Sequence, residues 1–154
     1  MNDTHITIVG NVVDEPRLRT TSAGVPVASF RIASTARKFD REQARWVDSE
    51  RLFATVTCWR ALARNVAASV TKGQPILATG RLYSREYVKD EATRVSYELD
   101  AEAVGHDLSR GTSEFHKLVR PVAVSTVDVD EAGIPADMTD ERLGGDTRVL
   151  ASVG

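Results

Sequence analysis

Apolar and polar residues alternate over most of the first 105 positions, and this two-residue period limits the fold more than any other feature of the sequence. Successive side chains of a β-strand point to opposite faces, so the alternation predicts half-buried strands. One segment differs, because Leu62, Val66 and Val70 recur every four residues and predict a short helix over 60–70. The predicted strands cover about 5–12, 25–35, 51–59, 76–88 and 94–104.

The order is therefore three strands, one helix and two strands. This order favours an all-β fold, a small five-stranded barrel of the oligonucleotide-binding type (OB-fold) with the helix between its third and fourth strands. Residues 36–50 are polar and charged, so we expect a long, mobile hairpin loop there. The chain is acidic and weakly hydrophobic beyond residue 125, which predicts disorder. We therefore divide the chain into a barrel (1–106), an extension (107–124) and a flexible acidic tail (125–154).

Charge is distributed unevenly, although the formal net charge is only −2. Residues 17–94 hold 15 lysines and arginines against 7 aspartates and glutamates, a net charge of +8. Residues 107–154 hold 5 against 9, a net charge of −4. A basic middle and an acidic end indicate an anionic ligand on the folded part and a solvated tail.

Several classes of protein are not supported by the sequence. No apolar run is long enough for a transmembrane helix, and the N-terminus lacks the features of a secretory signal. Cys58 is the single cysteine, so no intrachain disulfide can form and a reducing compartment is expected. The three histidines have no metal-ligand spacing, and no catalytic triad or phosphate loop is found. We expect a cytoplasmic protein that is not an enzyme and has no metal or cofactor.

In two predicted strands, the even-numbered and odd-numbered positions separate aliphatic from aromatic residues. We call this alternation the parity of a strand. In 51–59 the expected core-facing residues are Leu52, Ala54, Val56 and Cys58. The opposite face of that strand carries Phe53, Thr55, Thr57 and Trp59. In 76–88 the corresponding outward residues are Arg81, Tyr83, Arg85 and Tyr87. Phe30 and Tyr97 have core-side parity and are expected to be structural.

Aromatic rings beside guanidinium groups on an open face suit a single-stranded nucleic acid, because bases stack on the rings while arginines meet phosphates. The same rings could instead pack under a helix or between subunits, and Trp46 could either stack a base or contact a subunit. No catalytic or metal-binding residues are assigned. The candidate nucleic-acid-binding residues are Arg31, Arg37, Lys38, Phe39, Arg41, Arg45, Phe53, Trp59, Arg81, Tyr83, Arg85 and Tyr87.

The segment 8–19 (IVGNVVDEPRLR) resembles the opening of bacterial single-stranded-DNA-binding proteins, and 27–35 (VASFRIAST) is similar to the second strand of that family. The match continues in order through 53–59, the helix with Asn65-Val66-Ala67, Lys72-Gly73 and 79–85. It covers about residues 4–106 and looks most like the actinobacterial branch. The resemblance implies an OB-fold homotetramer that binds and protects single-stranded DNA in replication, recombination or repair.

The resemblance also implies individual roles. The stacking positions of the family fall on Phe53, Trp59 and Tyr87, and with a looser match on Phe39. The extension 107–124 lies where the actinobacterial branch has a strand that clamps a neighbouring subunit, and its Phe115 and Leu118 could serve that purpose.

The end of the sequence departs from the family pattern, because 148–154 (RVLASVG) is not an acidic tip ending in proline and phenylalanine. That tip recruits replication and repair enzymes in the family, so such partners are uncertain here and an accessory paralogue is expected. Two other interpretations of the barrel stay open: a protein-interaction module, and an RNA-binding module that would use the same residues.

Overall fold

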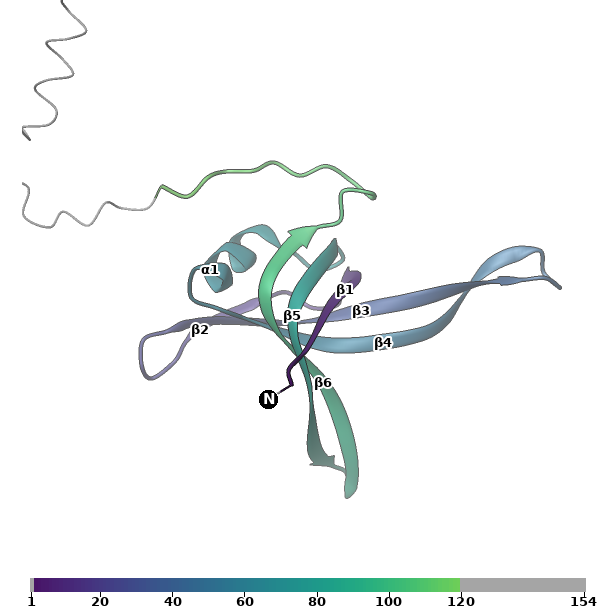
Figure 1. Cartoon of the computed structure of the whole chain (residues 1–154), viewed down its shortest axis with the longest axis horizontal. Helices are drawn as coiled ribbons and strands as arrows, with labels where there is room; N and C mark the ends of the chain where they lie inside the picture. The colour runs from purple at the N-terminus through teal and green to yellow at the C-terminus, as the bar shows by residue number, and fades with distance from the viewer. Residues whose placement is uncertain (1, 120–154) are drawn as a thin grey trace, which may run out of the picture. The chain divides into compact units, whose positions relative to one another are not determined.

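The computed structural model describes residues 2–119, and most of these residues lie in strands (Figure 1). Among them a single helix, α1, follows β4 directly. The elements are β1 (Thr4–Val12), β2 (Arg17–Thr20), β3 (Pro26–Asp40), β4 (Arg45–Trp59), α1 (Arg60–Ser69), β5 (Pro75–Lys89) and β6 (Ala92–His106).

Five of the strands close into a ring in the order β1-β5-β6-β4-β3, and β1 pairs with β3 to complete it. All neighbours are antiparallel except β4 and β6, which are parallel. The predicted all-β, five-stranded OB-fold with its helix between the third and fourth strands of the ring is confirmed. The ring needs a close approach where β1 turns from β5 to β3, because a Cβ at Gly10 would overlap the carbonyl oxygen of Ala33.

The core lies inside the ring and follows the alternation seen in the sequence. Ala54, Val56 and Cys58 of β4 are buried as predicted, whereas Leu52 is exposed. The predictions for Leu52 and Tyr97 are wrong for one reason. Both have core-side parity but are exposed, because they lie before the segments over which β4 and β6 pair to close the ring, Thr55–Thr57 and Glu98–Asp100. One face of α1 closes the barrel through Ala63 and Val66.

Two regions differ from the expected elements. The short strand β2 was not predicted; it pairs with β3 at the edge of the sheet, and all four of its residues are exposed. The expected mobile loop over 36–50 is wrong, because β3 continues to Asp40 and β4 begins at Arg45. Only 41–44 form the turn, where Asp40 Oδ1 accepts hydrogen bonds from the backbone N–H groups of Glu42 and Gln43.

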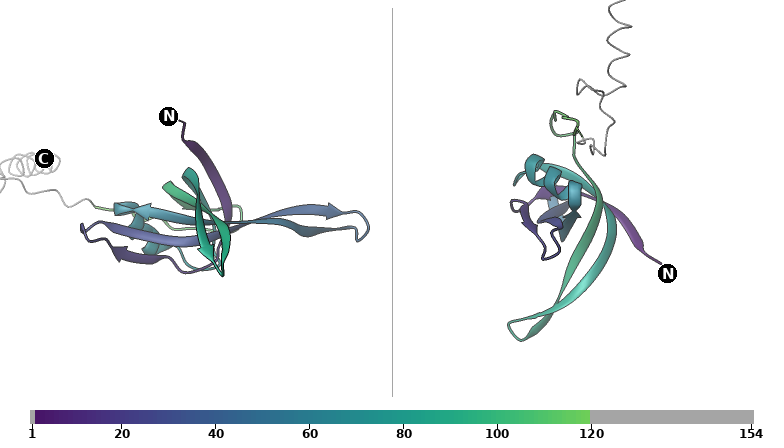
Figure 2. Two further views of the ribbon diagram at one scale, coloured as in Figure 1. Left: turned by 90° about the horizontal axis from the view of Figure 1, so that it is seen from below. Right: turned by 90° about the vertical axis from the view of Figure 1, so that its left-hand side faces the viewer.

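Two long hairpins therefore leave the barrel (Figures 1 and 2). We call residues 36–50 the β3–β4 arm and residues 83–97 the β5–β6 arm. Each hairpin has one register shift. In β3–β4 it falls between Thr35, which pairs with Arg51, and Arg37, which pairs with Asp48. In β5–β6 it falls between Thr79 and Gly80, within the barrel.

The chain after β6 has no helix or strand up to residue 119. His106 anchors its first part, because Nδ1 is hydrogen-bonded to Ser113 Oγ (2.8 Å) and Nε2 to Gln74 Oε1 (3.0 Å). Residues from Phe115 onward form a separate unit, in which Phe115 and Leu118 are exposed. The whole of the expected acidic tail (125–154) and the end of the expected extension (120–124 of 107–124) lie outside the described residues. Within 2–119, no helix is long and apolar enough to span a membrane.

Candidate nucleic-acid interface

Strand β4 presents two large rings on the outside of the barrel. Phe53 is 45% exposed and Trp59 is 40% exposed, while the intervening core residues are buried. The two rings share their face with Arg31 of β3, because Ala33 pairs with Phe53 and Arg31 pairs with Thr55. Directly paired residues lie on the same side of an antiparallel sheet. The predicted outward position of both β4 rings is confirmed.

Strand β5 presents a second row in which arginines and tyrosines alternate. Tyr83 and Tyr87 are each 42% exposed, and Arg81 and Arg85 are exposed beside them. The Arg81 guanidinium lies 5.2 Å from the centre of the Tyr83 ring, within the range of a cation–π contact. These four side chains lie on the outer face, as the parity predicts.

The two rows are not neighbours in the sheet, because β6 lies between β4 and β5. Parallel pairing places Asp100 of β6 beside Thr57 and Glu98 beside Thr55. On the other side, Asp100 pairs with Arg81 and Glu98 pairs with Tyr83. A pair of carboxylates therefore occupies the middle of the aromatic and cationic face.

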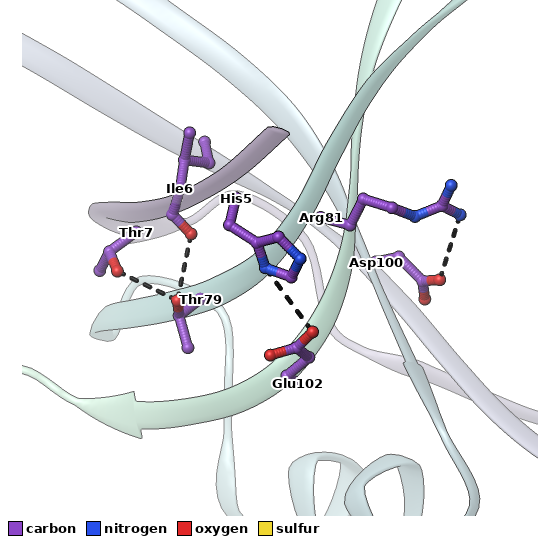
Figure 3. Close-up of polar contacts among 7 residues, drawn as sticks. All are labelled: His5, Ile6, Thr7, Thr79, Arg81, Asp100 and Glu102. Carbon is purple, nitrogen blue, oxygen red and sulfur yellow. Dashed lines mark hydrogen bonds and ion pairs between the residues drawn. The ribbon is translucent and has the colours of Figure 1, made fainter. Parts of the chain in front are cut away.

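Asp100 contacts both rows. Its Oδ1 accepts a hydrogen bond of 3.0 Å from Trp59 Nε1, and its Oδ2 lies 3.7 Å from Arg81 Nη2 (Figure 3). Figure 3 also shows His5 Nδ1 3.6 Å from Glu102 Oε1 on the same side of the barrel. Asp100 thus links a ring of β4 to a cation of β5.

Glu98 is on the outer face but is almost fully covered. Its side chain is 7% exposed, whereas that of Arg85, whose Nη2 lies 3.2 Å from Glu98 Oε1, is 69% exposed. The same oxygen accepts a hydrogen bond of 2.9 Å from Ser96 Oγ. The Arg85 guanidinium is therefore held by a carboxylate that water scarcely reaches.

The β3–β4 arm brings a third group of candidates together. Phe39 and Trp46 pair across the arm, with ring centres 5.8 Å apart in an edge-to-face contact. Arg37 donates to the carbonyl oxygen of Trp46 (3.3 Å) and lies 3.5 Å from Asp48. The extra residue in β4 at the register shift puts Trp46, an even-numbered residue, on the face of Phe53.

The remaining cations of the arm are exposed. Arg45 Nε donates to Gln43 Oε1 at 2.7 Å. Among the residues that the structure describes, no carboxylate lies within ion-pair distance of Lys38, Arg41 or Arg45. Arg31, by contrast, is tied to the barrel, because its Nε lies 3.2 Å from Asp14 Oδ2 and its backbone N–H donates to Asp14 Oδ1.

A polar groove of about 410 Å³ adds two arginines that were not predicted as site residues. It lies where β1, β3 and β4 meet, and Arg37, Arg51 and Arg110 are among the residues that line it. Arg51 has the outward parity of Phe53 and could have been found from it. Arg110 follows the last strand, and no local pattern indicates that it returns to the barrel.

Neither a reactive thiol nor a metal site has support in the described residues. Burial raises the pKa of the Cys58 thiol to about 12, and the nearby Asp100 carboxylate contributes to the rise, so the thiol is protonated at neutral pH. Within residues 2–119, no three histidine, cysteine, aspartate or glutamate side chains gather in a way that could hold a metal ion.

Comparison with known proteins agrees with this arrangement. The chain is 45% identical to the single-stranded DNA-binding protein of Corynebacterium glutamicum over 78% of its length, and 47% identical to single-stranded DNA-binding protein 2 of Streptomyces coelicolor over 75%. The matches span only 54% and 58% of those two relatives.

Solved structures give the same result. The small single-stranded DNA-binding protein of Streptomyces coelicolor is 43% identical and superposes with a TM-score of 0.67, over 72% of this chain and all of that one. The second such protein of Mycobacterium smegmatis is 34% identical, with a TM-score of 0.60 over 75% of this chain and all of that one. The model of the single-strand binding protein family matches residues 3–107, and the chain belongs to this family.

Proposed function

We propose that this protein binds single-stranded DNA with little dependence on sequence, as a homotetramer and without catalysis. The observation that carries the proposal is the outer face of β4, β6 and β5, where Phe53, Trp59, Tyr83 and Tyr87 are each at least 40% exposed. Every base has a flat face, so stacking on such rings tolerates any sequence. Membership of the family supports the same ligand.

The cations of the β3–β4 arm would meet the phosphates. Lys38, Arg41 and Arg45 are exposed on a hairpin that extends the sheet beyond Phe53. A strand stacked on Phe53 could therefore continue along the arm toward Phe39 and Trp46. These three cations form no ion pair among the described residues, so they predict a salt-dependent affinity, with a slope of about −0.7 in log K against log salt for each neutralised phosphate.

Assembly has support on another side of the barrel. Val9 of β1 and Leu77 of β5 are paired and both exposed, so an apolar patch faces outward. A second copy of the chain could cover it, because contiguous exposed apolar residues often mark contacts between proteins. Light scattering of a size-exclusion peak should give four chains per particle. Replacing Val9 with Glu should lower that number, and an unchanged tetramer would exclude this patch as a contact.

The test of the function is a titration with oligo-dT, followed by tryptophan emission at two salt concentrations. Trp46 and Trp59 are the only tryptophans, and both are exposed on the proposed face, so DNA should quench the emission. Binding should weaken at the higher salt. If oligo-dT at low salt neither quenches nor co-elutes with the protein, the proposal is wrong and a protein-interaction module is favoured. A matched RNA strand that binds as tightly as the DNA would favour an RNA-binding module instead.

Single substitutions test the face itself. Trp59→Ala or Phe53→Ala should weaken oligo-dT binding by about 1–3 kcal/mol for the lost stack. Tyr97→Ala is the matched control, because Tyr97 is an exposed aromatic residue on the opposite face of β6. An equal loss in all three variants would mean that exposed rings matter only for folding or assembly.

The wider setting belongs to the same proposal. Binding and protection of single strands would place the protein on the nucleoid in the cytoplasm, in replication, recombination or repair. Co-precipitation from cells whose DNA has been digested would show whether replication or repair proteins bind the chain directly.

A further inference from the structure

The middle strand of the proposed DNA-binding face is acidic. Glu98 and Asp100 of β6 lie between the rings of β4 and the arginines of β5. A phosphate approaching this face meets Arg81 and Arg85, each of which already has a carboxylate as partner: the partly exposed Asp100 and the nearly buried Glu98. The local charge of these four groups is balanced, although residues 17–94 as a whole are strongly basic.

Asp100 acts on two groups that DNA would use. Its Oδ1 holds the indole N–H of Trp59 at 3.0 Å, which fixes the edge of that ring. Its Oδ2 faces Arg81 at 3.7 Å, and Arg81 in turn lies over Tyr83. The position of one stacking ring and the availability of one cation therefore depend on the same carboxylate.

Glu98 holds its arginine more firmly. Its side chain is nearly buried, and its Oε1 has Arg85 (3.2 Å) and Ser96 (2.9 Å) as partners. If a phosphate drew Arg85 away, a buried carboxylate would keep only the Ser96 hydroxyl, which is costly. Arg85 is therefore a weaker phosphate ligand than its exposure indicates.

The cations of the β3–β4 arm give the contrast. Within the described part of the chain, Lys38 and Arg41 have no carboxylate at ion-pair distance. Asp40, which lies between them in the sequence, directs Oδ1 to the backbone of the turn. A phosphate can reach these cations without displacing a carboxylate.

We propose that Asp100 and Glu98 are built-in counterions that hold Arg81 and Arg85 back from DNA, and that Asp100 also positions Trp59. The proposal rests on the proposed single-stranded DNA binding. It assigns stacking to the β4–β6–β5 face and most of the phosphate contacts to the arm. The carboxylates weaken binding and reduce its dependence on salt, which lets a bound strand leave or shift along the protein more easily.

The experiment compares Asp100→Asn and Glu98→Gln with the unaltered protein in oligo-dT titrations over a tenfold range of salt. The Asn side chain keeps an oxygen for the Trp59 indole but removes the charge that holds Arg81. Each variant should bind more tightly at low salt. For each variant, the slope of log K against log salt should steepen by about 0.7. The ratio of its binding constant to that of the unaltered protein should therefore fall about fivefold across that range.

Glu86→Gln is the matched control. Glu86 is an exposed carboxylate of the same hairpin, but its side chain lies on the opposite face from Arg85. The substitution changes the net charge by the same amount, so a general effect of charge would steepen all three slopes equally. That result would overturn the proposal.

A further variant separates the two roles of Asp100. Asp100→Ala removes the charge and also the acceptor for the Trp59 indole, so it should free Arg81 but lower the extent of tryptophan quenching by oligo-dT. Equal quenching in the Asn and Ala variants would overturn the positioning role. Unchanged slopes in Asp100→Asn and Glu98→Gln, with normal binding by the unaltered protein, would overturn the counterion role. Loss of binding in the unaltered protein would instead refute the proposed function.

Discussion

The two hairpins that leave the barrel have similar ingredients but different electrostatics. Both are built from 15-residue strands, and both carry exposed rings on the outer face together with exposed cations. In the β5–β6 hairpin, Arg81 and Arg85 face the carboxylates of the neighbouring strand. In the β3–β4 arm, Lys38, Arg41 and Arg45 have no such partner among the described residues.

On the proposed DNA-binding surface, this difference means that the number of arginines is not the number of cations available to a phosphate. Whether a cation is available depends on which carboxylates lie within reach of it. Asp100 is paired directly with Arg81, whereas Glu98 reaches Arg85 from a diagonal position. Asp40 is the opposite case: it is acidic, but its carboxylate accepts hydrogen bonds from the backbone of the turn. Residues 36–50 hold four cations and four carboxylates, so the arm has no net positive charge. Only Arg37 among its cations lies within ion-pair distance of a carboxylate in the described residues.

The largest expected effect concerns the register shift of the β5–β6 hairpin. A Cβ at Gly80 would overlap the backbone of Asp100 and Ala101, which cannot move without separating β5 from β6. Gly80→Ala should lower the free energy of unfolding by about 3 kcal/mol, the upper part of the usual range for overpacking. Urea unfolding at fixed protein concentration measures it.

Gly105→Ala in the same hairpin is the control for that substitution. A Cβ there meets no atom within 4 Å, so the change should stay within about 0.5 kcal/mol. Equal stability of the two variants would mean that the close crossing of β5 and β6 at Gly80 is not required for the fold.

An intermediate effect is expected on the salt dependence of DNA binding. Arg41→Gln should make the slope shallower by about 0.7, because a free cation is lost. The double variant Arg85→Gln with Glu98→Gln removes an ion pair and should change the slope much less. Oligo-dT titrations at several salt concentrations compare them. If the double variant loses as much slope as Arg41→Gln, the two hairpins do not differ in the way proposed.

The smallest effect at neutral pH concerns a buried thiol in the core of the barrel, from which both hairpins extend. Cys58 precedes the exposed Trp59 but is fully buried, and burial raises its pKa from 9.0 to about 12. The folded thiol should resist alkylation at pH 8, and mass spectrometry should show rapid labelling only after urea is added. Since the unfolded thiol ionises first, the thiol should lower the stability of the fold as pH rises from about 9 towards 12. Labelling of the folded protein at the unfolded rate would show that the barrel opens readily.

Much of the fold could be predicted from the sequence because inward-facing and outward-facing side chains alternate along the strands of the barrel. The parity of β4 and β5 placed Ala54, Val56 and Cys58 inside and Arg81 and Tyr83 outside, and the structure agrees. The helix was visible from its four-residue period. These features are local, so they survive without knowledge of which strands are neighbours.

The rest depends on contacts that no local pattern encodes. The outer half of the β3–β4 arm has no core beneath it, so its residues show no alternation although they pair as strands. The position of β6 between β4 and β5 follows from ring closure, and it alone brings Asp100 to Trp59. The individual DNA contacts of the candidate residues stay predictions.

The extra residue of β4 between Asp48 and Arg51 has a geometric consequence. A bulge bends its strand and increases the local twist, so it sets the direction in which the arm leaves the barrel. Deleting Ser49 would leave Arg37 opposite Asp48 and Phe39 opposite Trp46, yet the arm would run straighter. The proposed path of a polynucleotide along the arm can thus be redirected by chain length alone, while the surface chemistry of the arm and the packed interior of the barrel stay as they are.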